Sequence, residues 1–319
     1  QEVFGTRLST SGLGLYPANS PLNVAGTPNA DLAFVVPQTG RYYARVSDGD
    51  TAYSLTMRVR RPVLESEAVG TKQKIFLDFD GAFIRREVFG AGTPGTARLS
   101  PLSNFLTGWG LSAADENRII DRIVAEFNIQ FNSNSSISVL GMNGDYNATA
   151  AAGQFGVEIL NSRDNPDAFG QPNVSRLIIG GTVTEFGFDT IGLAQSIDVG
   201  NFATSETGVI LLDNIQSSFV DIVPRAANKS AEDMIVKAIA NVAVHELGHM
   251  TGAWHTNNTN ALRQIMDAGG PQAFYAALVG SGADGIFGTA DDVVPGFGTD
   301  AYDFAAGPGG FGMQNSAVL

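Results

Sequence analysis

The chain has 319 residues, a formal net charge of −13 at pH 7 and 44% apolar residues. This length exceeds that of most single domains, so we expect one large or two unequal domains with a sizeable core. A surface of this charge excludes duplex nucleic acids and anionic membranes as favoured partners and favours cations.

Cysteine is absent, which excludes disulfide bonds and thiolate metal sites. No run of about eighteen apolar residues occurs, so no membrane-spanning segment is expected. With 38 glycines and 16% charged residues, the composition favours a loop-rich protein of the extracellular type.

The first 62 residues are expected to form a small all-β module. Stretches rich in aromatic and β-branched residues alternate there with turn residues, a pattern typical of short antiparallel strands. The expected strands are 32–36, 41–46 and 53–59. The segment Gly-Arg-Tyr-Tyr-Ala-Arg-Val at 40–46 resembles part of the pre-peptidase C-terminal β-sandwich, which is found beside secreted bacterial proteases. A generic β-module packed on the rest of the chain explains the pattern equally well.

The basic pair Arg60-Arg61 before Pro62 marks the expected boundary of this module. We therefore predict two domains, 1–62 and 63–319. In the second domain the strand and helix patterns are mixed, which predicts an α+β fold. The expected strands lie at 75–80, 136–140, 155–160 and 175–182.

Two long helices are predicted in the second domain, each opened by a capping box, and a short helix over 272–279 is expected to begin at Pro271. Ser112 and Asp115 begin the first helix, and an apolar stripe with helical spacing follows as far as Phe127. Ser230 and Asp233 begin the second helix. Its stripe continues at the same period into polar residues, in the order Ile235, Ile239, Val242, Glu246 and His249. The second helix is therefore expected to be buried and to carry chemistry.

The three histidines of the chain all lie in one motif, His-Glu-Leu-Gly-His-Met-Thr-Gly-Ala-Trp-His, at 245–255. On a helix His245 and His249 share a face and could hold one metal ion. Gly252 tolerates a left-handed backbone and can end the helix, which lets His255 supply a third nitrogen. Three protein ligands with one open position are typical of a catalytic zinc.

This motif matches HExxHxxGxxH and so resembles the metzincin clan of zinc endopeptidases. Gln-Ile-Met-Asp-Ala at 264–268 resembles the methionine turn of that clan, with Met266 as its methionine. The stretches 189–194 and 207–213 resemble the two strands before the active-site helix in reprolysin-like (adamalysin-type) members. The chain differs from reprolysins in lacking cysteine and in having Thr256 where they carry Asp.

The resemblance implies an α+β catalytic domain: a twisted mixed sheet with an active-site helix and a Met-turn. It implies zinc bound by His245, His249 and His255. Glu246 would be the general base that activates the zinc-bound water for peptide hydrolysis. Met266 would pack beneath the metal without ligating it.

A substrate-binding strand is also implied by the resemblance. In reprolysin-like enzymes the strand similar to 191–196 forms the sheet edge that lines the cleft. An extended peptide can join such an edge as an added strand. The expected contacts are with the backbone of Gly192, Leu193 and Ala194. The alternative is an internal strand whose backbone groups are all paired.

The loop 282–292 holds three aspartates separated by glycines: Asp284, Asp291 and Asp292. Carboxylate oxygens at such a loop could bind calcium. The alternative is that these residues only build tight turns.

The predicted function is a secreted zinc endopeptidase that acts on proteins or peptides. A cysteine-free member of this clan favours a bacterial source. Two alternatives remain open: a non-catalytic binding or adhesion protein on a metalloprotease scaffold, and a zinc hydrolase of a non-peptide amide. Glu246 argues against the first, because a decayed site usually loses its base.

Overall fold

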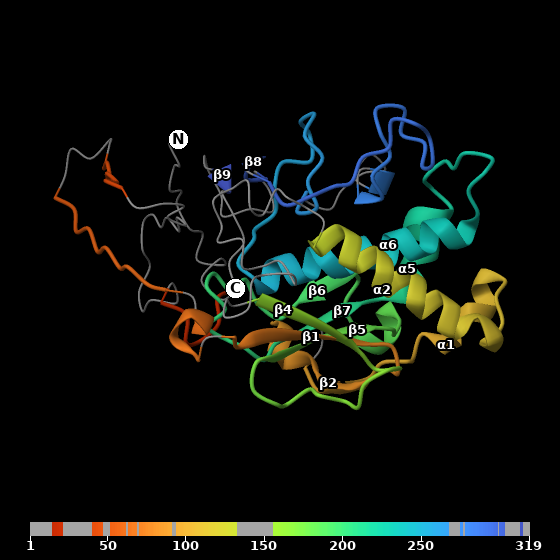
Figure 1. Cartoon of the computed structure of the whole chain (residues 1–319), viewed down its shortest axis with the longest axis horizontal. Coiled ribbons are helices and arrows are strands. Elements are labelled where there is room, and N and C mark those ends of the chain that lie inside the picture. The colour runs from red at the N-terminus through yellow and green to blue at the C-terminus, as the bar shows by residue number, and fades with distance from the viewer. Residues whose placement is uncertain are drawn as a thin grey trace.

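The computed structural model describes residues 15–21, 40–46, 52–61, 63–68, 70–90, 94–132, 156–267, 275–276, 278–298, 300–303 and 313–314. A five-stranded sheet with the order β4-β1-β5-β7-β6 lies at its centre (Figure 1). Neighbouring strands run parallel except β6, which runs antiparallel to β7 at one edge. The strands are β1 (Lys72–Asp78), β4 (Gly156–Asn161), β5 (Val174–Ile179), β6 (Gly192–Ala194) and β7 (Thr207–Ile210).

The predicted mixed α and β character of the second domain is confirmed, and so are three of its strands. The stretches 75–80, 155–160 and 175–182 correspond to β1, β4 and β5. Every residue of β5 and of β7 is buried, as expected for parallel strands covered on both faces. The predicted strand 136–140 lies outside the described residues.

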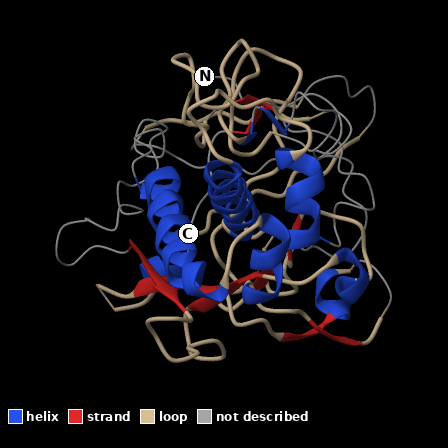
Figure 2. Cartoon of the chain, turned by 90° about the vertical axis from the view of Figure 1, so that its right-hand side faces the viewer, coloured by secondary structure: helices blue, strands red, loops and turns tan. Residues whose placement is uncertain are grey.

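Two long helices cover one face of the sheet (Figures 1 and 2). They are α2 (Glu116–Asn132) and α6 (Ala231–Met250). Helix α6 packs on β5, β6 and β7, and α2 packs beside α6. The shorter helices are α1 (Ser103–Leu106), α4 (Val183–Phe186), α5 (Leu212–Ile215), the 3-10 turns Val63–Ser66, Arg86–Phe89, Thr107–Trp109 and Ala113–Asp115, and a π-helical turn Gln216–Val220.

The opposite face of the sheet is covered by a hairpin. Strands β2 (Phe83–Arg85) and β3 (Thr96–Arg98) pair antiparallel. A second apolar cluster, which includes Phe89, Leu99, Ile178 and Val209, fills the space between them and the sheet. A further two-stranded pair, β8 (Asp300–Ala301) with β9 (Met313–Gln314), lies near the end of the chain. The sheet is therefore the middle layer of three, as burial on both faces requires.

Both predicted capping boxes are present. Asp115 Oδ2 accepts the Ser112 N–H (2.9 Å) ahead of α2. At α6 the Ser230 N–H donates to Asp233 Oδ2 (2.8 Å), and the Asp233 N–H donates to Ser230 Oγ (3.1 Å). These bonds satisfy N–H groups that the first turn of a helix leaves without partners.

Helix α6 is buried on every side along 238–250. Such burial is expected of a helix that is apolar all round. The helix ends at Thr251, and Gly252 follows with φ of +99°. A Cβ at Gly252 would lie 2.6 Å from Val199 Cα, so glycine is required by both the backbone angle and the contact. The prediction that Gly252 ends the helix is confirmed.

The expected strands at 41–46 and 53–59 are not formed. Neither segment contains strand structure, and Tyr43 and Val59 are 87% and 85% exposed. Alternating apolar side chains make a strand only where a second layer buries one face, and the described residues supply no such layer here. The expected strand 32–36 lies outside the described residues, so the N-terminal module and its boundary stay predictions.

No helix in the described ranges combines the length and hydropathy that a membrane crossing requires.

Replacing Asp233 by Asn tests the α6 cap. Burial raises the pKa of Asp233, but the bonds from Ser230 and Arg122 outweigh burial and hold it at about 2. A lowered folded pKa stabilises the protein above the unfolded value near 3.8, and this contribution is lost as pH falls toward 2. We expect Asp233→Asn to lower the free energy of unfolding by about 1 kcal/mol at pH 7, because solvent screens this partly exposed carboxylate.

Urea unfolding at several pH values measures this effect. The difference between wild type and Asp233→Asn should narrow below about pH 4. Asp80→Asn, at an exposed aspartate, is the matched control and should stay within about 0.5 kcal/mol of wild type. A difference that does not change with pH would contradict the assigned role of the carboxylate.

Candidate metal centre

The three histidines of the motif converge. The Nε2 atoms of His249 and His255 lie 3.2 Å apart, and those of His255 and His245 also lie 3.2 Å apart. His245 and His249 come from the last two turns of α6, and His255 comes from the chain that turns back after Gly252. Among the described residues this is the one group of three or more His, Asp or Glu side chains close enough to hold a metal ion.

Hydrogen bonds fix the tautomers of two rings. His245 Nδ1 lies 2.6 Å from the Ile265 carbonyl, and His249 Nδ1 lies 2.7 Å from the Ala253 carbonyl. Because a carbonyl oxygen only accepts, both Nδ1 atoms must carry the proton. Each Nε2 therefore presents a lone pair to the point where the three rings meet. Two lone pairs directed at one place could bind a metal ion there.

The spacing fits zinc. A tetrahedral ion with bonds of about 2.0–2.1 Å to nitrogen holds its ligand atoms about 3.3 Å apart. The observed separations of 3.2 Å match this value. Burial lowers the pKa of His245 to about 3, with a further contribution from His255, and burial lowers that of His249 well below its usual value. Both rings are thus neutral, which is the form that binds a metal.

Glu246 is buried and adjoins His245 in the sequence. Burial raises its pKa to about 8, and the N–H of Ala194 bonds to the carboxylate and opposes this rise. Gly192 faces the same side chain, since a Cβ there would lie 2.4 Å from Glu246 Oε1. The contacts of Glu246 with Ala194 and Gly192 join the helix to strand β6. Sequence reasoning missed these contacts, because the register of β6 against α6 cannot be obtained from either segment alone.

Strand β6 lies at the edge of the sheet. The N–H of Gln195 and the C=O of Ile191 bond to β7, so Gly192 and Ala194 direct their backbone groups to the other side. Two of those groups already have partners. The Ala194 N–H bonds to Glu246, and the Gly192 carbonyl accepts from Thr190 Oγ1. Substrate binding by Gly192, Leu193 and Ala194 stays a prediction.

Met266 packs directly on the helix that carries the histidines. It is 1% exposed, and a Cβ at Gly248 would lie 2.3 Å from its sulfur. The preceding residue, Ile265, supplies the carbonyl that orients His245. Asp267 closes the turn, because its Oδ1 accepts from Thr256 Oγ1 at 2.9 Å. The turn at 264–267 therefore holds the His245 ring in place.

The three aspartates predicted for calcium bond within their own loop. Asp284 Oδ1 accepts from the Ile286 N–H, Asp291 Oδ1 from Thr289 Oγ1, and Asp292 Oδ2 from the Gly288 N–H, at 2.8, 2.6 and 2.7 Å. These bonds are those of the turn-building alternative. Asp284, Asp291 and Asp292 do not form a metal-holding group within the described residues. Calcium binding by this loop stays a prediction.

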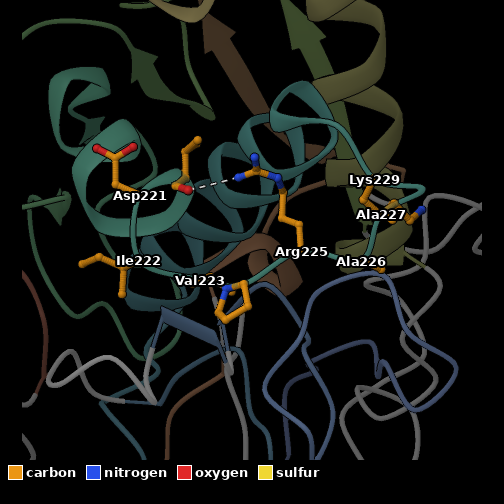
Figure 3. Close-up of a pocket in the computed structure, with 9 residues that line it drawn as sticks. Asp221, Ile222, Val223, Arg225, Ala226, Ala227 and Lys229 are labelled. Atoms are coloured by element: carbon orange, nitrogen blue, oxygen red, sulfur yellow. Dashed lines mark hydrogen bonds between the residues drawn. The ribbon is translucent and has the colours of Figure 1, made fainter.

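A hollow of about 470 Å³ lies in the segment before α6 and is lined by residues 220–227 and 229 (Figure 3). Arg225 turns back across it and donates to the Val220 carbonyl (3.0 Å). None of its lining residues belongs to the histidine site.

No protein-family model and no curated protein matches the chain. One solved structure that matches is described as the GM1 bound form of the ECX AB5 holotoxin. It shares 12% sequence identity over 63% of this chain and 66% of that chain, just under two thirds of its length, with a TM-score of 0.29. A similarity this weak supports no statement about fold or function.

Gly248→Ala tests the packing of Met266 on α6. The added methyl group would overlap the sulfur, and a Cβ would also lie 2.8 Å from Phe297 Cε1. We expect a loss of about 1–3 kcal/mol and a fall in Tm on the order of 5 °C. Gly108→Ala is the control, because no atom lies within 4 Å of a Cβ there. Equal Tm values for the two variants would contradict the close contact.

Proposed function

We propose that this chain is a zinc-dependent endopeptidase of the metzincin clan, of the reprolysin-like type. The observation that carries the proposal is the convergence of three imidazole nitrogens at 3.2 Å, with Glu246 next to one of them in sequence. Three histidine ligands leave a fourth position open, as catalytic zinc sites do. The turn at 264–267 beneath the helix and the antiparallel strand at the sheet edge support the same assignment.

Glu246 is the general base in this proposal. When bound, zinc supplies Lewis-acid polarisation of the scissile carbonyl and lowers the pKa of the attacking water to about 7. Glu246 accepts a proton from the water and later delivers it to the leaving nitrogen. A base works best with a pKa near the working pH. Burial raises the pKa of this carboxyl to about 8, and the charge of a nearby divalent cation acts in the opposite direction.

Ala194 and Gly192 place the base. The Ala194 N–H bonds to the carboxylate, which fixes its orientation, and Gly192 leaves the room that the carboxylate occupies. An Ala194→Pro substitution would therefore disturb Glu246 as well as the strand. Binding of a peptide along the edge strand β6 is therefore better tested by changing the substrate than by changing Ala194.

The proposed substrate is an extended peptide that joins β6 as an added strand. The Gly192 N–H and the Ala194 carbonyl point to the outer side of the edge, where such a peptide would pair. Main-chain pairing of this kind does not depend on the side chains of the peptide. Preference for particular substrate sequences would therefore come from pockets beside the strand. The proposed enzyme is secreted, and among secreted proteases of this clan the lack of cysteine favours a bacterial source.

Glu246→Gln is the first test. We expect the variant to keep about one zinc per chain and to lose cleavage of a mixed peptide library by at least a hundredfold, because the amide cannot accept the proton. Metal analysis and mass spectrometry of the digests measure the two properties. Glu67→Gln, at an exposed glutamate, should cleave as wild type does. Removal of the metal should abolish cleavage, and added zinc should restore it.

Loss of zinc in Glu246→Gln would make this residue a ligand and overturn its role as base. A zinc-loaded wild type that cleaves no peptide of the library would overturn the peptidase assignment and leave the amide hydrolase or the non-catalytic protein.

A scan of N-methylated peptides is the second test. Only alternate residues of an added strand direct their N–H toward the edge. N-methylation should therefore lower kcat/KM by up to about tenfold per lost bond, at every second position near the scissile bond. The intervening positions act as internal controls. Uniform loss at all positions would argue against pairing with β6.

A further inference from the structure

Two carboxylates outside the histidine site are fully buried close to one another. Asp198 lies in the loop between β6 and β7, and Glu206 immediately precedes β7. They are 0% and 1% exposed. Burial raises the pKa of Glu206 to about 8, and the charge of Asp198 contributes to this rise. The two groups are therefore near enough for their charges to repel.

Each carboxylate has one oxygen with a partner and one without. Asp198 Oδ2 accepts the Ala203 N–H at 2.6 Å, and Glu206 Oε1 accepts from Ser196 Oγ. Asp198 Oδ1 and Glu206 Oε2 are buried and have no hydrogen-bond partner within the described part of the chain. No other carboxylate oxygen in the described ranges is in this state.

Besides the Ala203 N–H, the backbone N–H of Phe202 also bonds to the Asp198 carboxylate, but no positively charged side chain among the described residues faces either group. Neither Lys nor Arg contributes to the pKa of either group. The amide of Gln73 donates to Ser175 Oγ and to the Thr204 carbonyl, at 3.1 Å each. The amide of Asn201 donates to Gln73 Oε1 at 2.9 Å. Gln73 and Asn201 are buried, and their side-chain N–H groups donate to atoms other than the two carboxylates.

Two other acids, the buried Asp78 and the half-buried Glu126, each have a positively charged partner. Asp78 lies 3.7 Å from Arg176, and Glu126 is paired with Lys237. Two buried anions without a counter-charge cost several kcal/mol, so such groups are normally paired or bind a metal. The unpartnered oxygens of Asp198 and Glu206 are therefore suited to bind a cation.

We propose that Asp198 and Glu206 bind a structural calcium ion. The donor set is oxygen only, which suits a hard cation and not zinc. Two carboxylates balance the charge of one Ca²⁺. Water and the oxygen-rich neighbours complete the six to eight ligands that calcium takes. This site is separate from the loop with Asp284, Asp291 and Asp292, where each carboxylate already has a donor.

The ion would act on the zinc site through the backbone. The Asp198 N–H donates to the His249 carbonyl at 3.0 Å, and Val199 contacts Gly252 at the end of α6. Calcium held by Asp198 would anchor this loop against the chain that carries His249 and leads to His255. Its contribution is to stability and does not depend on the peptidase proposal.

Calcium binding and Tm test the proposal directly. The protein is stripped of metals and reloaded with one equivalent of zinc, and calcium is then added. We expect wild type to bind one more calcium ion than Asp198→Asn/Glu206→Gln in equilibrium dialysis. Its Tm should rise by about 5 °C at a calcium concentration a hundredfold above Kd, and equal magnesium should raise it less.

The double variant has a second expected property. Without calcium its Tm should equal or exceed that of wild type, because the substitutions remove two buried carboxyl groups that are costly to ionise and keep the side-chain volumes. The single variant Glu206→Gln should bind calcium more weakly than wild type. The matched control Asp284→Asn/Asp291→Asn/Asp292→Asn should keep the calcium-dependent rise.

Three results would overturn the site: no rise in the wild type, an equal rise in the double variant, or loss of the rise in the triple control. None of these measurements involves peptide cleavage, so failure here and failure of the proposed function are distinguishable.

Discussion

Burial of helix α6 on every side along 238–250 is the constraint on which the rest of the structure depends. A helix covered on every side must satisfy each polar group from its surroundings, and α6 carries His245, Glu246 and His249 in that position. The Ile265 and Ala253 carbonyls and the Ala194 N–H meet this demand. The three partners come from separate segments, so the polar groups of one helix determine how a turn, a loop and an edge strand are arranged around it.

The sequence predicted the elements whose signal is local. Capping boxes identified the starts of both long helices, and the spacing of the histidines predicted that they would converge. The left-handed backbone of Gly252 was expected, because the chain must reverse after the helix to bring His255 to the other two histidines. Each of these depends on residues within about ten positions of one another, so helical geometry alone was sufficient.

The contacts between distant segments could not be predicted in this way. The bond from Ala194 to Glu246, the fit of Met266 against Gly248 and the burial of Asp198 with Glu206 all depend on tertiary register. The strands expected at 41–46 and 53–59 failed for a related reason. An alternating pattern indicates only that one face of a strand could be buried. It does not identify the segment that would cover that face.

The hydrogen bond from His245 to the Ile265 carbonyl has a thermodynamic consequence. The ring that donates this bond is the ring whose other nitrogen faces the metal position. Any ion bound there and the order of the 264–267 turn are therefore coupled, and coupling of this kind is reciprocal. If the ordered turn raises the metal affinity by some factor, metal binding favours the ordered turn by the same factor. The 264–267 turn, about twenty residues downstream of His245, would thus contribute to the binding free energy of an ion that it does not contact.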